Sequence, residues 1–423
     1  MVPPLVNAPT PTPQRVVLGV SGGIAAYKAC ELLRLFTESG HDVTVVPTVA
    51  ALKFVGAPTW EALSGKPVAS SVFADVASVP HVRLGQQADL VLVAPATANV
   101  LAKAASGLSD DLLTATLLTA RCPVVFAPAM HTEMWEHAAT RDNVATLRAR
   151  GAVVLEPASG RLTGADTGPG RLLEPAEIFE AAVEVLRRGA AGQRLDLAGR
   201  SVVVSAGGTR EFLDPVRYLG NRSSGKQGYA LARTAASRGA DVTLISANVT
   251  LPDPAGVKIV RVESTMELRD AVLTAARGVD AVVMAAAPAD FRPLIRAEHK
   301  IKKQVDAPQT TMELAENPDI LAELASSVTD RGSAAPVLVG FAAETGDDEM
   351  SVLEHARTKL TRKGCDILVV NDVSHGAVFG SDDNEAVILR RDADEVRAPH
   401  GSKAALAQQV WDCVVQCWGD SRR

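Results

Sequence analysis

The sequence predicts an α/β protein with two doubly wound domains, each built on a parallel sheet. Short β-branched apolar runs alternate with alanine- and leucine-rich stretches along most of the chain, which is the pattern of parallel strands joined by helices. The pattern breaks at residues 188–199 (RGAAGQRLDLAG), where glycine and charged residues interrupt it, and then restarts. We therefore expect two domains that join near residue 195.

The elements follow one another in a regular order. Residues 1–14 are rich in proline and have no periodic apolar face, so we expect a disordered tail. The first domain, residues 15–190, includes a helix from about Ala25, and its strands are expected at RVVLGV, DVTVVPT, LVLVAPA, CPVVFAPAM and AVVLEP. A linker at 191–199 precedes the second domain, residues 200–418, with strands at SVVVSAGG, DVTLISA, VKIVRV, AVVMAAAPAD, PVLVGFAAE and ILVVND.

Bulk composition excludes two classes of partner. The chain has 423 residues, of which 47% are hydrophobic and 22% charged, and its net charge is −6 with acidic and basic residues interspersed. No continuous basic face results, so nucleic acid is not an expected partner. No apolar run approaches the roughly 20 residues that span a bilayer, and no basic region followed by an apolar one opens the chain. We expect a cytoplasmic protein without a membrane partner.

The five cysteines, Cys30, Cys122, Cys365, Cys413 and Cys417, fall in different apolar contexts. The close pair in CVVQC has a C-x-x-x-C spacing, which suits neither zinc knuckles nor thioredoxin motifs. We interpret all five as reduced structural thiols, as in other cytosolic proteins.

Both halves open with an apolar strand that runs into a glycine-rich turn and then a helix, as VVLGVSGGIAAYK and VVVSAGGTRE. Such a turn lets backbone N–H groups converge on a phosphate at the carboxyl edge of a sheet. Neither stretch is a complete G-x-G-x-x-G, and glycine in this position also serves tight packing. The turns therefore indicate that an anion can bind, without indicating which one.

Four motifs accumulate in the first half: SGGIAAYK at 21–28, His81 ahead of LVLVAPATAN, SDDLL at 109–113 and PAMHTEMW at 128–135. Together they resemble the flavin-dependent cysteine decarboxylase family, over about residues 15–185, which implies a flavodoxin-like domain with flavin mononucleotide (FMN) as cofactor. The resemblance implies three roles. The FMN phosphate is lined by Ser21, Gly22, Gly23 and Ile24, the flavin is approached by Pro95, Thr97, Ala98 and Asn99, and the catalytic base is His81.

The chemistry explains why a decarboxylation without net oxidation uses a flavin. Loss of CO₂ from an N-acyl cysteine leaves electrons on a carbon with no acceptor beside it, so the barrier is prohibitive. Oxidation of the carbon that bears sulfur, with loss of the thiol proton to a base, gives a thioaldehyde that accepts the carboxyl electrons. The reduced flavin then returns the hydride, and the protein supplies orientation and the base.

Two positions depart from the family pattern. His131 stands where the family has asparagine to contact the substrate carboxylate, and histidine can still donate a hydrogen bond there, with a charge that depends on pH. In the flap segment SGRLTGADTGPGRL, Gly164 stands at the position of the family's cysteine. The proton donor for the final reduction is therefore open among Thr163, Asp166 and water. The neighbouring Met130, Met134 and Trp135 also fit a helical core stripe.

The second half carries seven motifs: SAGGTRE, DPVRYLGNRSSGKQGYALA, AAAPADF, KIKK, NPDIL, GFAAET and ILVVND. They resemble the phosphopantothenate–cysteine ligase family from residue 199 to about 415, which implies a Rossmann-like domain. The bacterial form of this ligase uses CTP to activate the phosphopantothenate carboxylate. A carboxylate is a poor electrophile, and an acyl cytidylate provides a leaving group that the cysteine nitrogen can displace.

Cations must offset the charge of a triphosphate, and lysines with Mg²⁺ suit that task. The lysines of KIKK (Lys300, Lys302 and Lys303) and, further along, Lys359 and Lys363 are the candidates. The resemblance implies that Asn221 contacts the activated carboxyl, that Arg217 binds the substrate phosphate, and that Lys300 acts at the triphosphate or in the cysteine attack. It places the nucleotide against Met284, Ala285, Ala286, Asp290, Pro318, Asp319, Ile320, Leu321 and Phe341. No metal ligand is predicted.

Two alternatives concern the NRSSGK turn. It is also a good helix-capping turn, in which Ser223 or Ser224 satisfies first-turn amides, so Asn221 and Arg217 have a structural interpretation as well. Gly225 and Gly228 allow close approach of another chain or of a ligand, and the sequence does not separate these.

Together the resemblances imply two steps of coenzyme A synthesis: ligation of 4'-phosphopantothenate to cysteine, then decarboxylation to 4'-phosphopantetheine. They also imply trimers of the decarboxylase with flavin at subunit boundaries, dimers of the ligase, and hence a homododecamer. One rival is a ligase whose flavin-binding half is regulatory and catalytically disabled, as the changes at His131 and Gly164 allow. Another is a flavin prenyltransferase-like or other flavin-dependent lyase, which would not need the second half.

Overall fold

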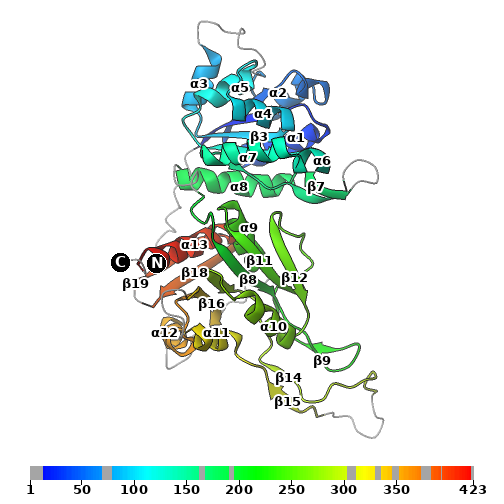
Figure 1. Cartoon of the computed structure of the whole chain (residues 1–423), viewed down its shortest axis with the longest axis vertical. Helices are drawn as coiled ribbons and strands as arrows, with labels where there is room; N and C mark the ends of the chain where they lie inside the picture. The colour runs from blue at the N-terminus through cyan, green and yellow to red at the C-terminus, as the bar shows by residue number, and fades with distance from the viewer. Residues whose placement is uncertain are drawn as a thin grey trace, which may run out of the picture. The chain divides into compact units, whose positions relative to one another are not determined.

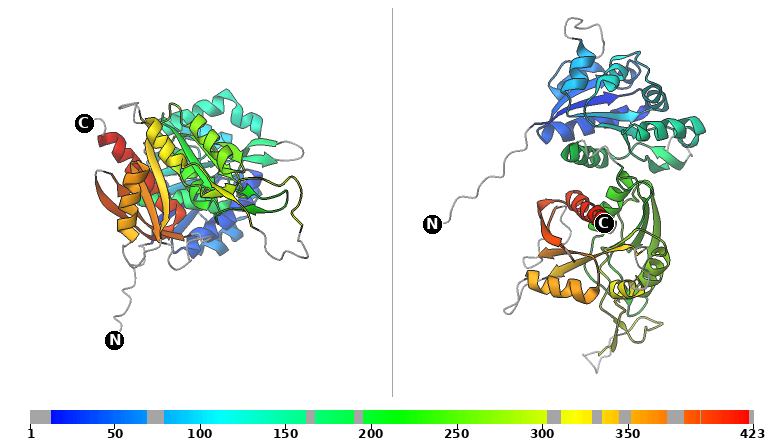
Figure 2. Two further views of the ribbon diagram at one scale, coloured as in Figure 1. Left: turned by 90° about the horizontal axis from the view of Figure 1, so that it is seen from below. Right: turned by 60° about the vertical axis from the view of Figure 1, so that its left-hand side comes forward.

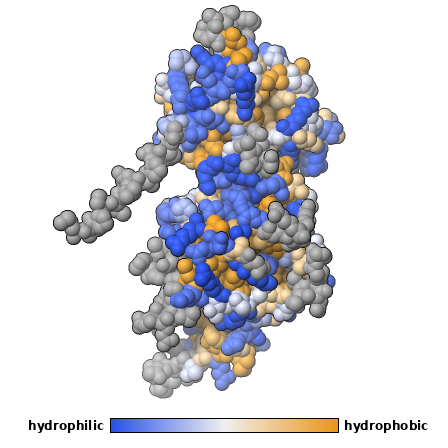
Figure 3. Space-filling model, turned by 90° about the vertical axis from the view of Figure 1, so that its left-hand side faces the viewer, coloured by the Kyte–Doolittle hydropathy of each residue, from blue (hydrophilic) through white to orange (hydrophobic). Residues whose placement is uncertain are grey.

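The computed structural model describes residues 13–68, 79–161, 167–189, 195–302, 311–328, 335–344, 352–372, 383–391 and 393–420. The chain divides into two compact units, Met1–Leu195 and Asp196–Arg423, here the N-terminal and C-terminal units. The predicted linker at 191–199 spans this division. In each unit helices cover both faces of a central sheet (Figures 1 and 2). On the face drawn in Figure 3 most of the coloured surface is hydrophilic, with apolar residues in smaller patches.

The N-terminal unit is built on a parallel sheet whose described strands are ordered β2-β1-β3-β4-β5. This is the 2-1-3-4-5 order of flavodoxin-like folds, so the predicted class is confirmed. The strands are β1 (Arg15–Val20), β2 (Asp42–Pro47), β3 (Leu90–Ala96), β4 (Val124–Pro128) and β5 (Val153–Val154), and a hairpin adds β6 (Ala158–Arg161) and β7 (Thr167–Arg171). The helices are η1 (Ile24–Tyr27), α1 (Lys28–Glu38), η2 (Ala51–Lys53), α2 (Ala57–Ser64), α3 (Pro80–Gln87), α4 (Ala98–Ser106), α5 (Leu112–Thr119), α6 (Thr132–Glu136), α7 (Ala138–Ala149) and α8 (Pro175–Arg188).

Alternate residues of β1 belong to two apolar clusters on opposite faces of this sheet. Val16, Leu18 and Val20 pack with α1 and α8, while Val17 packs with α4, α5 and α7. The helix predicted from about Ala25 begins as the 3-10 turn η1 and becomes α-helical at Lys28. Sequence signals set other starts: Asp111 caps α5 by accepting a 2.7 Å hydrogen bond from the N–H of Thr114.

The C-terminal unit contains a sheet ordered β12-β11-β8-β13-β16-β17-β18-β19. Its first six strands are parallel and follow the Rossmann order, whereas β18 and β19 pair antiparallel at one end, which the sequence analysis did not anticipate. The sheet strands are β8 (Ser201–Gly207), β11 (Asp241–Ala247), β12 (Val257–Val262), β13 (Ala281–Met284), β16 (Val337–Glu344), β17 (Ile367–Asp372), β18 (Asp383–Arg390) and β19 (Ala393–Ser402). The helices are α9 (Lys226–Ser237), α10 (Thr265–Ala275), α11 (Ile320–Val328), α12 (Val352–Lys363) and α13 (Lys403–Asp420).

Two small hairpins project from the body of the C-terminal unit (Figure 1). One joins β9 (Glu211–Phe212) to β10 (Tyr218–Leu219), and the other joins β14 (Phe291–Pro293) to β15 (Leu314–Glu316). We refer to residues 211–219 and 291–302 together as the arm. The ring of Phe212 lies 6.0 Å from that of Tyr218, and the guanidinium of Arg296 lies 5.0 Å above the Phe212 ring.

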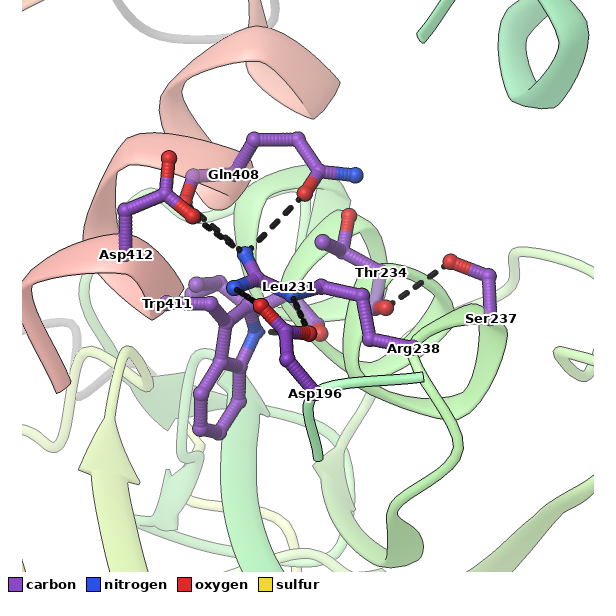
Figure 4. Close-up of polar contacts among 8 residues, drawn as sticks. All are labelled: Asp196, Leu231, Thr234, Ser237, Arg238, Gln408, Trp411 and Asp412. Atoms are coloured by element: carbon purple, nitrogen blue, oxygen red, sulfur yellow. Dashed lines mark hydrogen bonds and ion pairs between the residues drawn. The ribbon is translucent and has the colours of Figure 1, made fainter. Parts of the chain in front are cut away.

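One face of this sheet is covered by α9 and α13, which pack against each other. Leu406, Val410 and Trp411 of α13 are buried in the cluster that also holds Tyr229 and Leu231 of α9. The indole N–H of Trp411 donates a 3.0 Å hydrogen bond to the carbonyl of Leu231, as Figure 4 shows. The opposite face is covered by α10, α11 and α12.

Candidate functional site

The glycine-rich turn of the N-terminal unit lies at the carboxyl edge of the sheet, beside a pocket of about 1020 Å³. The pocket brings together segments from β1, β3 and β4 that are far apart in the sequence, as expected where parallel strands end at one edge. Among the predicted flavin and substrate residues, those that line it are Ser21, Gly22, Gly23, Ile24, Thr97, Ala98, Asn99 and His131.

One buried hydroxyl joins the two predicted flavin turns. Ser21 Oγ donates to the carbonyl of Pro95 at 2.7 Å and accepts from the N–H of Thr97 at 3.0 Å. The Ser21 N–H also reaches the Pro95 carbonyl, at 3.3 Å. Ser21 and Pro95 therefore fix the two turns to each other, and Pro95 acts through its carbonyl rather than as a lining residue.

The turn itself presents hydrogen-bond donors to an anion. Within the described part of the chain, the N–H groups of Gly22, Ile24 and Ala25 have no hydrogen-bond partner. A Cβ added to Gly22 would lie 2.3 Å from the Cβ of Ala50, so the close approach of Ala50 requires glycine here. Three free donors on a turn that only glycine permits fit a phosphate group such as that of FMN.

His131 is exposed and lies where its imidazole can act on a bound molecule. It is the N-cap residue of α6, but its side chain makes no hydrogen bond to that helix. The preceding segment is fixed, because the N–H of Met130 donates to the carbonyl of Gly170 at 2.9 Å and a Cβ at Gly170 would lie 2.4 Å from the Met130 carbonyl oxygen. β7 therefore holds the PAMH segment against the pocket.

His81 lies outside this pocket. It is half-buried in the first turn of α3, and its carbonyl accepts a 2.7 Å hydrogen bond from Thr119 Oγ1. Its buried Nδ1 has no partner among the residues that the structure describes. One copy of the chain thus does not bring the predicted base to its own flavin pocket. The flap positions Thr163, Gly164 and Asp166 lie outside the described residues.

Charged residues at this pocket are mostly paired, and the sequence analysis did not single them out. Lys28 Nζ lies 2.9 Å from Glu174, whose carboxylate also pairs with Arg171. Lys103 holds the carboxylate of Asp110 at 2.7 Å, and this hydrogen bond lowers the pKa of Asp110 below its ordinary value. Lys28 is the last residue of the SGGIAAYK motif, so its place there was the available signal.

A second pocket, of about 670 Å³, lies at the carboxyl edge of the sheet in the C-terminal unit. It brings together residues from 221 to 403, and most predicted nucleotide residues are among them. Those that line it are Asn221, Met284, Ala285, Ala286, Asp290, Pro318, Asp319, Ile320, Leu321, Phe341, Lys359 and Lys363.

The loop after β13 is fixed to the loop after β8 by buried polar groups. Thr209 Oγ1 accepts from the N–H of Ala289 at 2.8 Å and lies 2.8 Å from Thr265 Oγ1. The carboxylate of Glu211, itself buried, accepts from the N–H of Thr265 at 2.8 Å. The SAGGTRE motif therefore supports the 284–290 loop, and the sequence analysis missed this structural role of Thr209 and Glu211.

Asn221 also holds this loop. Its side-chain amide donates to the carbonyl of Pro288 at 2.8 Å, so its carbonyl oxygen is the atom left for a ligand. On the other side, Asn317 donates from its side chain to Ala289 and from its backbone to Asp290, at 2.9 and 2.8 Å. The wall predicted to hold the nucleotide is thus supported from both ends.

Lys363 pairs with the carboxylate of Asp319 at the far side of the pocket. Both residues were predicted nucleotide contacts, and in this structure each compensates the charge of the other. Asp319 also accepts from the N–H of Ala322 at 3.2 Å, which caps α11. Phe341 is half-buried and packs against the sheet face that α9 and α13 cover.

The structure does not bring every predicted residue to the pocket. Arg217 and Lys300 are exposed on the arm and lie outside the lining, as does the neighbouring Lys302. Lys303 lies outside the described residues. Arg217 contacts a fully buried carboxylate, Asp214, that the sequence analysis missed, although an aspartate ahead of proline is a known turn signal.

The glycines of the NRSSGK turn face their own chain. A Cβ at Gly228 would lie 2.4 Å from that of Ala206 on β8, and Gly225 has φ +75° with Val249 side-chain atoms 2.5 Å from an added Cβ. Close packing of α9 on β8 and on Val249 requires both glycines. Both also line the pocket, so the close approach of a ligand stays a prediction.

Two negative findings hold for the described ranges. No group of three or more histidine, cysteine, aspartate or glutamate side chains there is placed to hold a metal ion. None of the helices described is both long and apolar enough to cross a membrane. All five cysteines are free thiols.

Comparisons with known proteins cover both units. Residues 197–417 match the family described as DNA/pantothenate metabolism flavoprotein C-terminal domain, and residues 8–187 match the Flavoprotein family. The coenzyme A biosynthesis bifunctional protein CoaBC of Mycobacterium bovis is 60% identical over 405 residues, which cover 95% of this chain and 96% of that protein. The protein of the same name from Vibrio vulnificus is 43% identical over 400 residues, covering 94% and 96%. A solved C-terminal domain of CoaBC is 32% identical with a TM-score of 0.44 and covers 53% of this chain and 98% of its own.

Proposed function

The chain belongs to the family of bifunctional coenzyme A biosynthesis proteins, and from its two pockets we propose which residues perform each reaction. It is an enzyme with a flavoprotein decarboxylase half and a ligase half. We propose that CTP-dependent ligation of 4'-phosphopantothenate to cysteine takes place in the C-terminal unit. FMN-dependent decarboxylation of the product, to 4'-phosphopantetheine, follows in the N-terminal unit.

The pocket of the N-terminal unit is the proposed FMN site. The free N–H groups of Gly22, Ile24 and Ala25 would hold the phosphate, and the turn from Thr97 to Asn99 would face the ring system. When bound, the flavin supplies a reversible hydride acceptor for the carbon that bears sulfur. His131 would donate a hydrogen bond to the substrate carboxylate, more strongly when its imidazole is protonated.

His81 would reach this pocket from a neighbouring copy of the chain. It is displaced from its own pocket, and the rim of that pocket carries exposed apolar side chains, among them Ile24, Tyr27, Val49 and Met134. Such a patch is typical of a surface that another chain covers. A trimer with flavin at its subunit boundaries satisfies both observations. His81 would then take the thiol proton of a substrate bound in the pocket of the neighbouring subunit.

The pocket of the C-terminal unit is the proposed CTP site. The backbone of Met284, Ala285 and Ala286 and the turn from Pro318 to Leu321 would enclose the nucleotide, with Phe341 and Asp290 beside it. Lys359 and Lys363 would meet phosphate oxygens, the latter by exchanging its pairing with Asp319, and Mg²⁺ would share the charge. The free carbonyl oxygen of Asn221 faces the same pocket, where the acyl cytidylate would form.

Arg217 and Lys300 would complete a ligase site through a second copy of the chain. The arm that bears them exposes apolar side chains, including Tyr218, Leu294 and Ile295, the last with 80% of its surface accessible. Burying them against a partner is favourable, and a twofold dimer would place each arm on the other subunit. Trimers of one half and dimers of the other combine into the proposed homododecamer.

The observation that carries this proposal is the gathering of twelve predicted residues, from Asn221 to Lys363, in the lining of one pocket. A mass-spectrometric product assay tests it on the purified protein with phosphopantothenate, cysteine, CTP and Mg²⁺. We expect phosphopantetheine, CMP and pyrophosphate. Accumulation of the cysteine adduct without CO₂ release would instead favour a ligase whose flavin half is disabled, the alternative raised by Gly164 in place of a flap cysteine.

A further inference from the structure

We propose that Asp214 is a positioning residue for ligation. It joins Arg217, proposed to bind the substrate phosphate, and Lys300, proposed to act at the triphosphate or in the cysteine attack, into one rigid element. The inference rests on the proposed ligase roles of Arg217 and Lys300 and goes beyond them. It assigns to a carboxylate outside the pocket lining the task of setting the distance between these two cations.

Asp214 is buried to a degree that is unusual for a carboxylate in a projecting hairpin. None of its side chain is exposed to solvent. Its Oδ1 accepts hydrogen bonds from the N–H groups of Val216 and Arg217, both at 2.8 Å, and its Oδ2 accepts from the N–H of Ile301 at 3.1 Å. The first two bonds shape the turn between β9 and β10. The third crosses to Ile301, the residue directly after Lys300.

Arg217 closes the same connection from the other side. Its Nη2 lies 3.0 Å from Asp214 Oδ2 and also donates to the carbonyl of Ile301. Asp214 and the backbone of Ile301 thus hold one end of the guanidinium, while 46% of the Arg217 side chain remains exposed. A guanidinium has five N–H donors in a fixed plane, so its outer edge stays available for a phosphate.

The carboxylate stays charged in this setting. Burial alone would raise its pKa, but the N–H groups of Val216, Ile301 and Arg217 and the charge of Arg217 together hold the pKa of Asp214 below its ordinary value. Each donor therefore faces an anion, and hydrogen bonds to charged groups are the stronger class.

Polar contacts of this kind are the main restraint on the arm. None of the four apolar core clusters contains a described residue of 211–219 or 291–302. Within the described residues, the two arm segments are also linked by a hydrogen bond from the N–H of Ala297 to the carbonyl of Leu213, at 3.0 Å, by the packing of Arg296 on Phe212, and by contact between β9 and β14. Loss of the Asp214 carboxylate should therefore loosen the arm while both sheets stay folded.

The test is steady-state ligation by the full-length holoenzyme carrying Asp214→Asn, with cysteine saturating. We expect kcat/KM for phosphopantothenate to fall by roughly 10- to 100-fold, through both a higher KM and a lower kcat, because Arg217 and Lys300 are no longer held at a fixed distance from each other. The KM for CTP should rise less than the KM for phosphopantothenate, because most of the nucleotide pocket lies at the sheet edge, outside the arm. Asp253→Asn is the matched control: its carboxylate pairs with Arg261 at 2.7 and 2.8 Å on an exposed surface.

A second variant separates the two links. Ile301→Pro removes the N–H that donates to Asp214 and leaves the Asp214–Arg217 pair in place. We expect it to lower kcat with little change in the KM for phosphopantothenate, whereas Arg217→Ala should mainly raise that KM. The double variant Asp214→Asn/Arg217→Ala should lose less than the product of the two single losses, because the residues act as a unit.

Three results would overturn the inference: unchanged kinetics in Asp214→Asn, equal effects on the KM values of CTP and phosphopantothenate, or fully multiplicative losses in the double variant. These are distinct from failure of the proposed function, which the wild-type protein reports by making no cysteine adduct from CTP. Urea denaturation of each variant, followed by far-UV circular dichroism, checks that the C-terminal unit is folded.

Discussion

Arg238 holds the carboxylate of Asp196 with two nearly parallel hydrogen bonds, Nε to Oδ1 at 2.9 Å and Nη2 to Oδ2 at 2.7 Å (Figure 4). Its Nη1 lies 2.8 Å from Asp412 and donates to Gln408, both on α13. Only 1% of the arginine side chain is exposed. One guanidinium at the end of α9 therefore ties the first residue of the C-terminal unit to its last described helix.

Replacing this arginine should destabilise the C-terminal unit. Arg238→Met keeps the apolar stem but leaves two carboxylates without their cation, and we expect a loss of about 2 to 4 kcal/mol in the free energy of unfolding, below the full cost of a buried pair because both acids are partly exposed. Urea denaturation of the full chain measures it. Arg261→Met breaks an exposed pair and should stay within about 0.5 kcal/mol; a similar loss there would show that burial is not the cause.

His81→Asn should abolish decarboxylation and spare ligation. If His81 takes the thiol proton, its loss lowers the decarboxylation rate by roughly 10²- to 10⁴-fold, the usual contribution of a general base. CO₂ release from supplied phosphopantothenoylcysteine measures this. His137→Asn is the control, since His137 caps α7 through its side chain and asparagine is also a good cap. Undiminished CO₂ release from His81→Asn would remove the residue from its role.

Lys300→Gln should have the reverse effect. Glutamine keeps most of the side-chain length and removes the charge, so we expect ligation to fall by roughly 10²- to 10³-fold, as when one charge-stabilising donor is removed. Pyrophosphate release with CTP, phosphopantothenate and cysteine provides the measurement. Lys258→Gln, on the exposed edge strand β12, should be indistinguishable from the wild type. Retained ligation in Lys300→Gln would assign the charge compensation to other cations.

Gly22→Ala should weaken FMN binding. The new Cβ would lie 2.3 Å from the Cβ of Ala50, so the turn must shift. Its N–H groups would then no longer point toward a single phosphate. We expect about 5- to 150-fold weaker binding of FMN by fluorescence titration of the apoprotein, for an overpacking cost of about 1 to 3 kcal/mol. Gly56→Ala meets only Pro58, at 3.6 Å, and should bind normally. Equal affinity in the two variants would contradict the steric argument.

The half-buried thiol of Cys122 and the buried thiol of Cys365 should be inert at neutral pH. Burial raises the pKa of Cys122 and of Cys365 to about 11, so fewer than about one molecule in a thousand carries either thiolate at pH 7.5. The thiolate population grows as the pH rises toward 11. Alkylation of the native protein with iodoacetamide, read by peptide mass spectrometry, should leave both sites unmodified at pH 7.5 and fully modified after denaturation. Rapid labelling of the native state at pH 7.5 would contradict these pKa values.

The sequence predicts most strands and turns of this fold well, because they depend on the residues within each segment. β-branched runs such as LVLVAPA and DVTLISA are strands because both faces of a parallel sheet are buried, and the glycine-rich turns that the sequence predicts follow β1 and β8. The antiparallel strands β18 and β19 were not foreseen. Polar residues interrupt their segment, which is the composition of an edge rather than of a buried strand.

The sequence does not predict hydrogen bonds and ion pairs between residues that lie far apart along the chain. Arg238 stands in SRGAD, which reads as a solvated turn, and its partners lie 42 and 170 residues away. Asp214 was overlooked for the same reason, since its link to Ile301 spans 87 residues. The sequence pattern also does not predict that His81 lies outside its own pocket, because patterns within one chain carry no information about which surfaces a second copy covers.

The position of α13 sets the order in which a growing chain can complete its two units. Leu406, Val410 and Trp411 belong to the core of the C-terminal unit, yet the ribosome adds them after every strand of that unit's sheet. The N-terminal unit, which ends at Leu195, can fold while the rest is still being made. The ligase half must wait for residues 403–420 to leave the exit tunnel, so a message cut short at its 3′ end would yield a decarboxylase without its ligase.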